Sequence, residues 1–217
     1  MNRGAGRPPS GAATALGAVL AGGSGSRLGG AKPTAELAGR PLISFPLAAL
    51  AAAGLEAVVV AKPDTELPDF GAPGWAGEGE ETPAPRLILE PREPRHPLAG
   101  IVAALRDAGT RPLVVLACDM PLASPALLAA LAAAPDPLVV PSPGGLLEPL
   151  QARYSASLLA SLEAALAERA PLRQTVAALG PRLLGEAELS RFGPVERSFL
   201  NVNDAADLAR AEELLGG

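Results

Sequence analysis

Three short segments of the chain combine residue types that bind phosphates and metal ions. The first, residues 20–32, reads Leu-Ala-Gly-Gly-Ser-Gly-Ser-Arg-Leu-Gly-Gly-Ala-Lys and directly follows an apolar run. Its glycines let backbone N–H groups turn toward an anion without interference from Cβ atoms, and Arg27 and Lys32 add positive charge there. Lys32 follows Ala31, so the segment does not fit a P-loop, and Leu28 stands where a dinucleotide fingerprint needs its third glycine. A glycine-rich linker is the alternative, and we favour phosphate binding.

The second segment places one carboxylate at the end of an uninterrupted apolar run. Residues 114–121 read Val-Val-Leu-Ala-Cys-Asp-Met-Pro. Open α/β sheets bind ligands at the carboxyl ends of their strands, where Asp119 would lie. A buried carboxylate is costly unless it is paired or bound to a metal, so we favour metal coordination over a turn or helix-cap role. Cys118 has no histidine nearby in the sequence and is expected to be a small buried hydrophobe.

The third segment, residues 199–204, reads Phe-Leu-Asn-Val-Asn-Asp. In an extended chain Asn201 and Asn203 would share one face, and Asp204 would be free to cap the last helix. Turn and capping roles explain asparagines near a helix start as often as ligand binding does. This segment alone therefore carries little weight.

The elements between these segments predict a doubly wound α/β fold. Short apolar runs alternate with Ala/Leu-rich helical stretches, which indicates a single Rossmann-like domain with a mostly parallel, twisted sheet and helices on both faces. The predicted strands are 16–20, 57–61, 86–90, 113–118 and 138–140, with an extended 199–203. The predicted helices are 41–53, 98–108, 124 onward, 157–169, 173–179 and 204 onward. Residues 62–85 form a long loop, a kind that is usually functional or disordered.

Composition limits the class of protein. The 217 residues suit one domain over 14–217 after a disordered tail, 1–13. A net charge of −5 argues against nucleic-acid or anionic-membrane partners. A single cysteine excludes an internal disulfide, and with a single histidine it excludes a structural zinc site. The sequence has no run of eighteen uncharged apolar residues that could span a bilayer, and we expect a cytoplasmic location rather than secretion.

The three segments together resemble the molybdenum cofactor guanylyltransferases, a family with the nucleotide-diphospho-sugar transferase fold. The resemblance spans about residues 16–215 in the family's order. It rests on residues 20–23, on 27–29 with Lys32, on Pro-Leu-Ala-Gly-Ile at 97–101, on 118–121 and on 199–203. The chain departs from the family pattern at Ala31, usually aspartate, and at His96, usually glycine; the second departure bears on the nucleotide pocket.

The resemblance implies transfer of GMP from GTP to the phosphate of molybdopterin that carries molybdenum, with release of pyrophosphate. It implies Mg²⁺ on Asp119, with Asn201 or Asn203 completing the metal shell or contacting the acceptor. Proteins of molybdenum insertion or molybdoenzyme maturation are possible partners. The implied catalytic residues are Arg27, Lys32 and Asp119. The implied nucleotide-binding residues are Leu20, Ala21, Gly22, Gly23, Ser24, Gly25, Lys32, Glu90, His96, Pro97, Leu98 and Gly100. The implied acceptor-binding residues are Arg153, Asn201 and Asn203.

Other interpretations stay open at this point. An enzyme of the same fold could use CTP on molybdopterin, or GTP on a phospholactate-type acceptor, and a non-catalytic nucleotide-binding regulator could use the same scaffold. Glu90 could contact a guanine edge or a ribose hydroxyl, or form a salt bridge. His96 could equally be a loop residue, and Arg153 a solvated side chain. Lys62 could line the nucleotide crevice. Arg92 and Arg95 are expected in a solvated loop.

Overall fold

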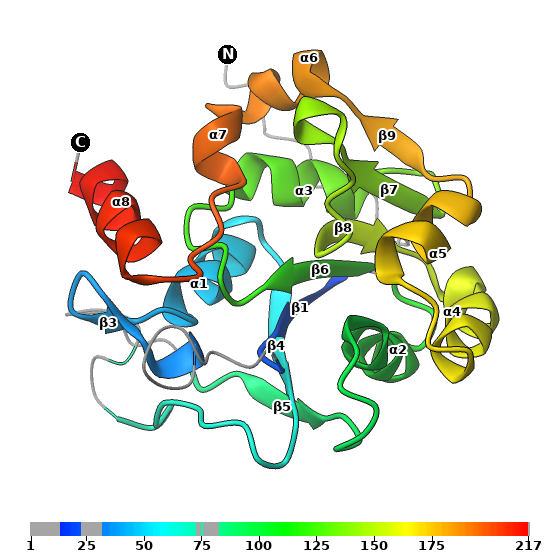
Figure 1. Cartoon of the computed structure of the whole chain (residues 1–217), viewed down its shortest axis with the longest axis horizontal. Coiled ribbons are helices and arrows are strands. Elements are labelled where there is room, and N and C mark those ends of the chain that lie inside the picture. The colour runs from blue at the N-terminus through cyan, green and yellow to red at the C-terminus, as the bar shows by residue number, and fades with distance from the viewer. Residues whose placement is uncertain (1–13, 23–31, 73–74, 76–82, 217) are drawn as a thin grey trace, which may run out of the picture.

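A seven-stranded sheet forms the centre of the computed structural model, which describes residues 14–22, 32–72, 75 and 83–216 (Figure 1). Within the described residues of this seven-stranded sheet, only β8 (Gln151–Tyr154) runs antiparallel to its neighbours. In sheet order the strands are β5 (Arg86–Leu89), β4 (Glu56–Ala61), β1 (Leu16–Leu20), β6 (Leu113–Ala117), β8 (Gln151–Tyr154), β7 (Leu138–Pro141) and β9 (Arg182–Leu184). The predicted, mostly parallel α/β fold is therefore confirmed.

Helices cover both faces of this sheet (Figure 1). On one face α1 (Ser44–Ala52) and α3 (Pro125–Ala133) pack against side chains such as Val19 and Leu116. On the other face α2 (Pro97–Ala108), α4 (Leu159–Ala167) and α5 (Leu172–Ala178) pack against side chains such as Val58 and Val115. Each central strand is buried on both faces, which explains why its sequence is an uninterrupted apolar run.

Helix boundaries follow local signals in the sequence. Ser124 caps α3 as expected, because its hydroxyl accepts a hydrogen bond from Leu127 N at 3.4 Å, and Pro125 occupies the first turn. The helix predicted from Pro41 begins instead at Ser44. Pro41 belongs to a small antiparallel hairpin of β2 (Glu36–Leu37) and β3 (Arg40–Pro41), which the sequence analysis missed.

The C-terminal segment packs against this hairpin. After the short helices α6 (Glu186–Leu189) and α7 (Val195–Ser198), the chain crosses to α8 (Ala205–Gly216). Val202 and Ala211 join Leu37, Leu42 and Phe45 in a small apolar cluster separate from the two main cores. Asp204 caps α8, since its Oδ1 accepts hydrogen bonds from Ala206 N at 2.9 Å and Asp207 N at 3.0 Å.

The direction of chain progression reverses between β1 and β6. From β1 the chain adds β4 and then β5 on one side, and β6 then pairs with the opposite side of β1. Leu20 at the end of β1 lies level with Ala117 at the end of β6. Doubly wound sheets open a crevice at such a reversal, outside the carboxyl ends of the strands. None of the helices in the described part of the chain is long and apolar enough to cross a membrane.

Candidate functional site

Asp119 lies two residues beyond the end of β6, at the strand reversal, and pairs with Lys32. Lys32 Nζ donates to Asp119 Oδ2 at 2.7 Å and to Asn203 Oδ1 at 2.9 Å. A backbone hydrogen bond of 2.8 Å from Val202 N to Asp119 O holds the last segment against this turn. The site thus joins three regions that are 87 and 171 residues apart in sequence.

The first glycine after β1, Gly22, lies against the Glu90 carboxylate. A Cβ atom built on Gly22 would overlap Glu90 Oε1. The preceding Ala21 N donates to Val60 O at 2.8 Å, and Leu20 O accepts from Cys118 N at 3.2 Å. These bonds fix the end of β1 between β4 and β6. The expected site residues Gly23, Ser24, Gly25 and Arg27 lie outside the described residues.

A cavity of about 300 Å³ opens beside this turn. It reaches from Asp119 and Lys32 at one end to the loop before α2 at the other. Its lining among the described residues is Leu20, Gly22, Lys32, Lys62, Glu90, Arg95, His96, Pro97, Gly100, Ala117, Cys118, Asp119 and Leu150. Pockets of this size hold small organic ligands. The sequence analysis expected Arg95 in a solvated loop and did not single out Leu150.

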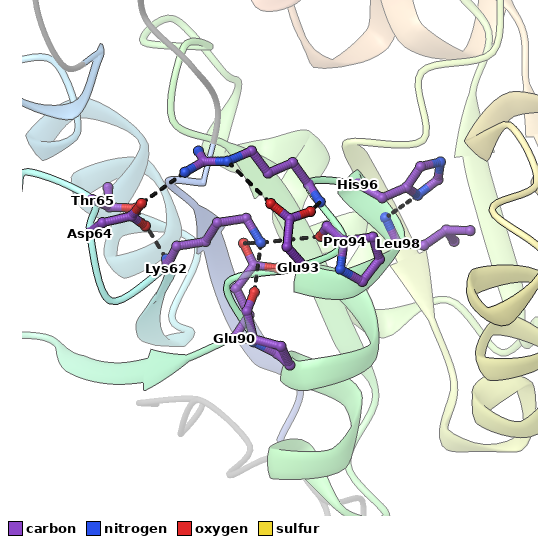
Figure 2. Close-up of polar contacts among 10 residues, drawn as sticks. Lys62, Asp64, Thr65, Glu90, Glu93, Pro94, His96 and Leu98 are labelled. Atoms are coloured by element: carbon purple, nitrogen blue, oxygen red, sulfur yellow. Dashed lines mark hydrogen bonds and ion pairs between the residues drawn. The ribbon is translucent and has the colours of Figure 1, made fainter.

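The start of α2 forms one wall of the cavity. His96 has extended backbone and caps the helix, because its Nδ1 accepts a hydrogen bond from Leu98 N at 3.2 Å (Figure 2). Pro97 occupies the first turn, and a Cβ atom on Gly100 would lie 3.3 Å from the Leu20 side chain. The small residue lets the helix approach β1 closely. The positive end of the helix dipole therefore adjoins the cavity.

Glu90 and Lys62, which also line the cavity, form a buried ion pair beside Gly22 and Gly100. Glu90 is 5% exposed and Lys62 3% exposed, with 3.6 Å between Oε1 and Nζ. Burial raises the pKa of the Glu90 carboxyl, and the Lys62 charge opposes that rise. Glu90 Oε2 is buried and has no hydrogen-bond partner in the structure.

Cys118 lies at the cavity but is not a nucleophile there. The thiol is buried, and this burial, together with the Asp119 charge, raises its pKa to about 12. A thiol with that pKa stays protonated at neutral pH.

The two asparagines of the third segment have different surroundings. Asn203 directs its side-chain oxygen to Lys32, whereas Asn201 Nδ2 donates to Phe199 O at 3.2 Å. Asn201 lines a separate open groove, together with Ser142, Glu186 and Arg210. They therefore do not share one face as an extended segment would require.

Arg153 does not join the site. Its guanidinium donates to Asp136 O at 2.8 Å and to Ala132 O at 3.2 Å, and the residue is buried. β8 runs antiparallel to β6, with Arg153 opposite Val114 and thus three residues back from the end of β6. The expectation of an acceptor-binding arginine here is not supported, because its donors bind backbone carbonyls.

The donor set at Asp119 fits a divalent cation. Two oxygen atoms, Asp119 Oδ2 and Asn203 Oδ1, converge on the single positive charge of Lys32 Nζ. Carboxylate and amide oxygens suit magnesium, which takes its remaining ligands from water and substrate phosphates. The described residues contain no cluster of three or more histidine, cysteine, aspartate or glutamate side chains that could hold a metal alone.

The chain is similar to several known proteins. The model of the MobA-like NTP transferase domain matches residues 17–183. A probable molybdenum cofactor guanylyltransferase of Chloroflexus aggregans is 33% identical, covering 92% of this chain and 94% of the relative. A molybdenum cofactor guanylyltransferase of Cereibacter sphaeroides is 32% identical, covering 92% and 96%. The crystal structure of molybdopterin-guanine dinucleotide biosynthesis protein A from Archaeoglobus fulgidus matches with a TM-score of 0.72 at 29% identity, covering 93% and 98%.

Proposed function

The chain belongs to the MobA-like NTP transferase family of nucleotidyltransferases, and from that premise we propose that it transfers GMP from GTP to the terminal phosphate of molybdopterin carrying molybdenum. The names of the relatives that match over 92% of the chain support this substrate pair. The observation that carries the proposal is the convergence of Lys32, Asp119 and Asn203 beside a cavity at the strand reversal.

The reaction asks for positioning more than for acid–base chemistry. An oxygen of the acceptor phosphate attacks the α-phosphorus of GTP, the bond to the bridging α–β oxygen breaks, and pyrophosphate leaves with that oxygen. The attacking phosphate is already ionised at neutral pH, so the site needs no general base. Catalysis then depends on holding two anions together and on neutralising the charge of the leaving group.

Residues of this chain divide that work between them. The backbone amides of residues 22–25 hold the β- and γ-phosphates, and Arg27 and Lys32 stabilise charge on the pyrophosphate. The nucleoside lies in the cavity that is lined by Leu20, Gly22, His96, Pro97 and Gly100, and Glu90 belongs to the same lining. Leu98 is not among the residues that line the cavity, and its backbone N–H donates to His96 Nδ1, so its part is to hold His96 at the start of α2.

Nucleotidyl transfer commonly uses a divalent cation, and Mg²⁺ is the cation we propose here. Asp119 and Asn203 would hold it, since both side-chain oxygens face one point. When bound, the ion supplies positive charge between the triphosphate and the acceptor phosphate. Lys32 Nζ occupies that position in this structure, and it would contact the phosphates of the substrate when the ion is bound.

The acceptor lies on the C-terminal side of Asp119 in this proposal. Asn201 supports that placement because it lines the open groove next to the segment that carries Asn203. Arg153 is left out, since its donors are occupied by backbone carbonyls. We also propose that molybdenum-insertion proteins deliver the acceptor and that maturation proteins receive the product. The proposed location is the cytoplasm.

Pyrophosphate release tests the function directly. Purified protein with GTP, Mg²⁺ and molybdenum-loaded molybdopterin should release one pyrophosphate per guanine dinucleotide formed. Parallel reactions receive CTP in place of GTP, phospholactate in place of molybdopterin, or no acceptor. Faster turnover with CTP or with phospholactate would assign the chain to a different transferase. Binding of GTP without pyrophosphate release, with acceptor present, would indicate a regulator.

A further inference from the structure

Lys62 is a buried cation whose side-chain hydrogen bonds go to one neighbouring loop. It follows β4 directly, and its side chain is 2% exposed. Nζ donates to Pro91 O at 2.7 Å and to Pro94 O at 3.2 Å, and Glu90 Oε1 lies at 3.6 Å; Figure 2 shows the side chain reaching Glu90 and Pro94. An ammonium group has three N–H donors. Two carbonyls accept hydrogen bonds from this group and the Glu90 carboxylate pairs with its charge, so Lys62 is engaged by its own surroundings and not by a nucleotide.

The loop that Lys62 holds leads directly into the cavity wall. A second ion pair, from Arg95 to Asp64 at 2.8 Å, ties the far end of residues 91–95 to the same turn after β4. The turn is closed by paired hydrogen bonds between Lys62 and Thr65 at 3.0 and 3.1 Å. His96 and Pro97 follow at once and line the cavity. The position of these residues therefore depends on Lys62.

The two oxygens of Glu90 have different surroundings. Oε1 faces Lys62 and fits into the space that Gly22 leaves by having no side chain. Oε2 is buried without a partner in a residue that lines the cavity. A buried carboxylate oxygen without a hydrogen bond is unfavourable, and a ligand that donates to it removes that penalty. Oε2 therefore favours a ligand with an N–H donor over one with an acceptor at that point.

We propose that Lys62 is a positioning residue for selection of the base: it holds Glu90 in one orientation, with Oε2 presented to the N1–H and 2-amino donors of guanine, and it fixes residues 91–95 around that edge. The inference rests on the proposed function, since it takes GTP as the substrate. Lys62 itself does not touch the nucleotide. Its loss acts on the recognition of the base and leaves the transfer step intact.

Lys62→Met tests this role because methionine keeps the length of the side chain and removes the charge. We expect the KM for GTP to rise by about tenfold or more, with kcat at saturating GTP changed by less than about threefold. The preference for GTP over ITP, which lacks the 2-amino group, should fall by a similar factor. Glu90→Gln should give the same pattern. Arg86→Met is the matched control. It removes a cation from the first residue of β5, which does not line the cavity, and it should change none of these values.

The double variant Lys62→Met/Glu90→Gln shows whether Lys62 acts through Glu90. If it does, the double variant loses no more GTP preference than the worse single variant. It also provides a neutral pair if the single lysine variant fails to fold, and its melting temperature should then exceed that of Lys62→Met. Additive losses in the double variant would overturn the proposal. A fall in kcat with the GTP/ITP preference intact would also overturn it.

Binding of GTP and ITP without acceptor, measured by calorimetry on the full chain, separates this inference from the function beneath it. The proposed function fails if the wild-type protein binds GTP no better than CTP, before any variant is made. The role of Lys62 fails if the wild-type protein prefers GTP and Lys62→Met retains that preference.

Discussion

Lys32 and Lys62 each place an ammonium group among oxygen atoms at the edge of the same cavity, but the oxygens belong to different parts of the chain. Lys32 reaches Asp119 and Asn203, which are 87 and 171 residues away. Lys62 reaches carbonyls 29 and 32 residues away, in the loop after the next strand. The Lys32 side chain is 14% exposed and that of Lys62 is 2% exposed.

This difference separates an exchangeable cation from a permanent one. Water reaches Lys32 and Asp119, so phosphates and a metal ion compete with that pair on favourable terms. Lys62 lies in a region of low dielectric, where an unpaired charge is strongly unfavourable. Water has almost no access to Lys62 or Glu90, so no ion from solvent competes with this pair. Lys32 is therefore suited to exchange its protein partners for phosphates during the reaction. Lys62 is suited to hold its loop in one fixed position. The predictions below test this contrast.

The largest effect is expected at Asp119. Asp119→Asn keeps the shape of the side chain but removes its charge, so it should lower kcat by about a thousandfold. Its melting temperature should stay near that of the wild-type protein, because the carboxylate is partly exposed. Steady-state pyrophosphate release and thermal unfolding measure the two quantities. A variant with most of its activity would remove Asp119 from the metal site.

Replacing Lys32 should weaken catalysis and strengthen metal binding at once. Lys32→Met should lower kcat by about a hundredfold, because a charge on the leaving pyrophosphate is lost. The same variant should bind Mn²⁺ alone about fivefold more tightly than the wild-type protein, because the cation that now occupies the two oxygens is gone. Electron paramagnetic resonance titration without nucleotide measures this affinity. Unchanged or weaker Mn²⁺ binding would contradict the exchange.

Replacing Lys62 should instead affect stability, in a way that depends on pH. Lys62→Met leaves Glu90 without its counter-charge, and breaking a buried pair in this way costs about 3 kcal/mol at neutral pH. Burial already raises the pKa of Glu90 above its ordinary value, and loss of Lys62 raises it further. A carboxyl whose folded-state pKa is raised destabilises the fold as pH rises through the unfolded-state value. The stability deficit should therefore be larger at pH 8 than at pH 5.

Urea unfolding at the two pH values measures that deficit. Glu90→Gln in the Lys62→Met background should remove most of its pH dependence, because the titrating group is gone. A deficit of equal size at both pH values would mean that Lys62 contributes through packing and not through charge.

The smallest effect is expected at the exposed pair of Arg86 and Asp107. The guanidinium is bidentate, with distances of 2.6 and 2.7 Å, and its hydrogen bonds lower the pKa of Asp107. A carboxyl with a lowered pKa stabilises the fold above its ordinary pKa and loses this effect as pH falls. Arg86→Ala should therefore cost less than about 1 kcal/mol at pH 7 and still less below pH 4. Calorimetric melting at both pH values provides the check.

The buried centre of the fold was the most predictable part. Apolar runs such as 16–20 and 113–117 carry their own signal, because a strand buried on both faces has no polar alternation. The direction of β8 was not predictable, since nothing in residues 151–154 indicates whether the strand pairs parallel or antiparallel with its neighbours. Arg153 lies in this strand, with its guanidinium bound to the carbonyls of Asp136 and Ala132. The short hairpin that takes up Pro41 depends on packing against α8, far along the chain.

The candidate site was predictable where a rule about strand ends applies. Asp119 and Lys62 both follow buried strands, so their place at the edge of the sheet could be expected. Their partners could not. The sequence left Asn201 and Asn203 as alternatives, since the direction of each side chain depends on how the last segment crosses Asp119. Glu90 was expected near the nucleotide, but its free oxygen is visible only with Lys62 and Gly22 in position.

The crossing of Val202 over Asp119 has a consequence for synthesis of the protein on the ribosome. Within the described part of the chain, the residues that line the cavity lie between 20 and 150, so this part of the pocket is made before the last segment leaves the ribosome. Asn203 emerges 171 residues after Lys32. The cavity residues of a nascent chain are thus made long before Asn203. Because Asn203 is needed beside Asp119, the protein becomes active only after the segment around Val202 has been synthesised and packed against Asp119.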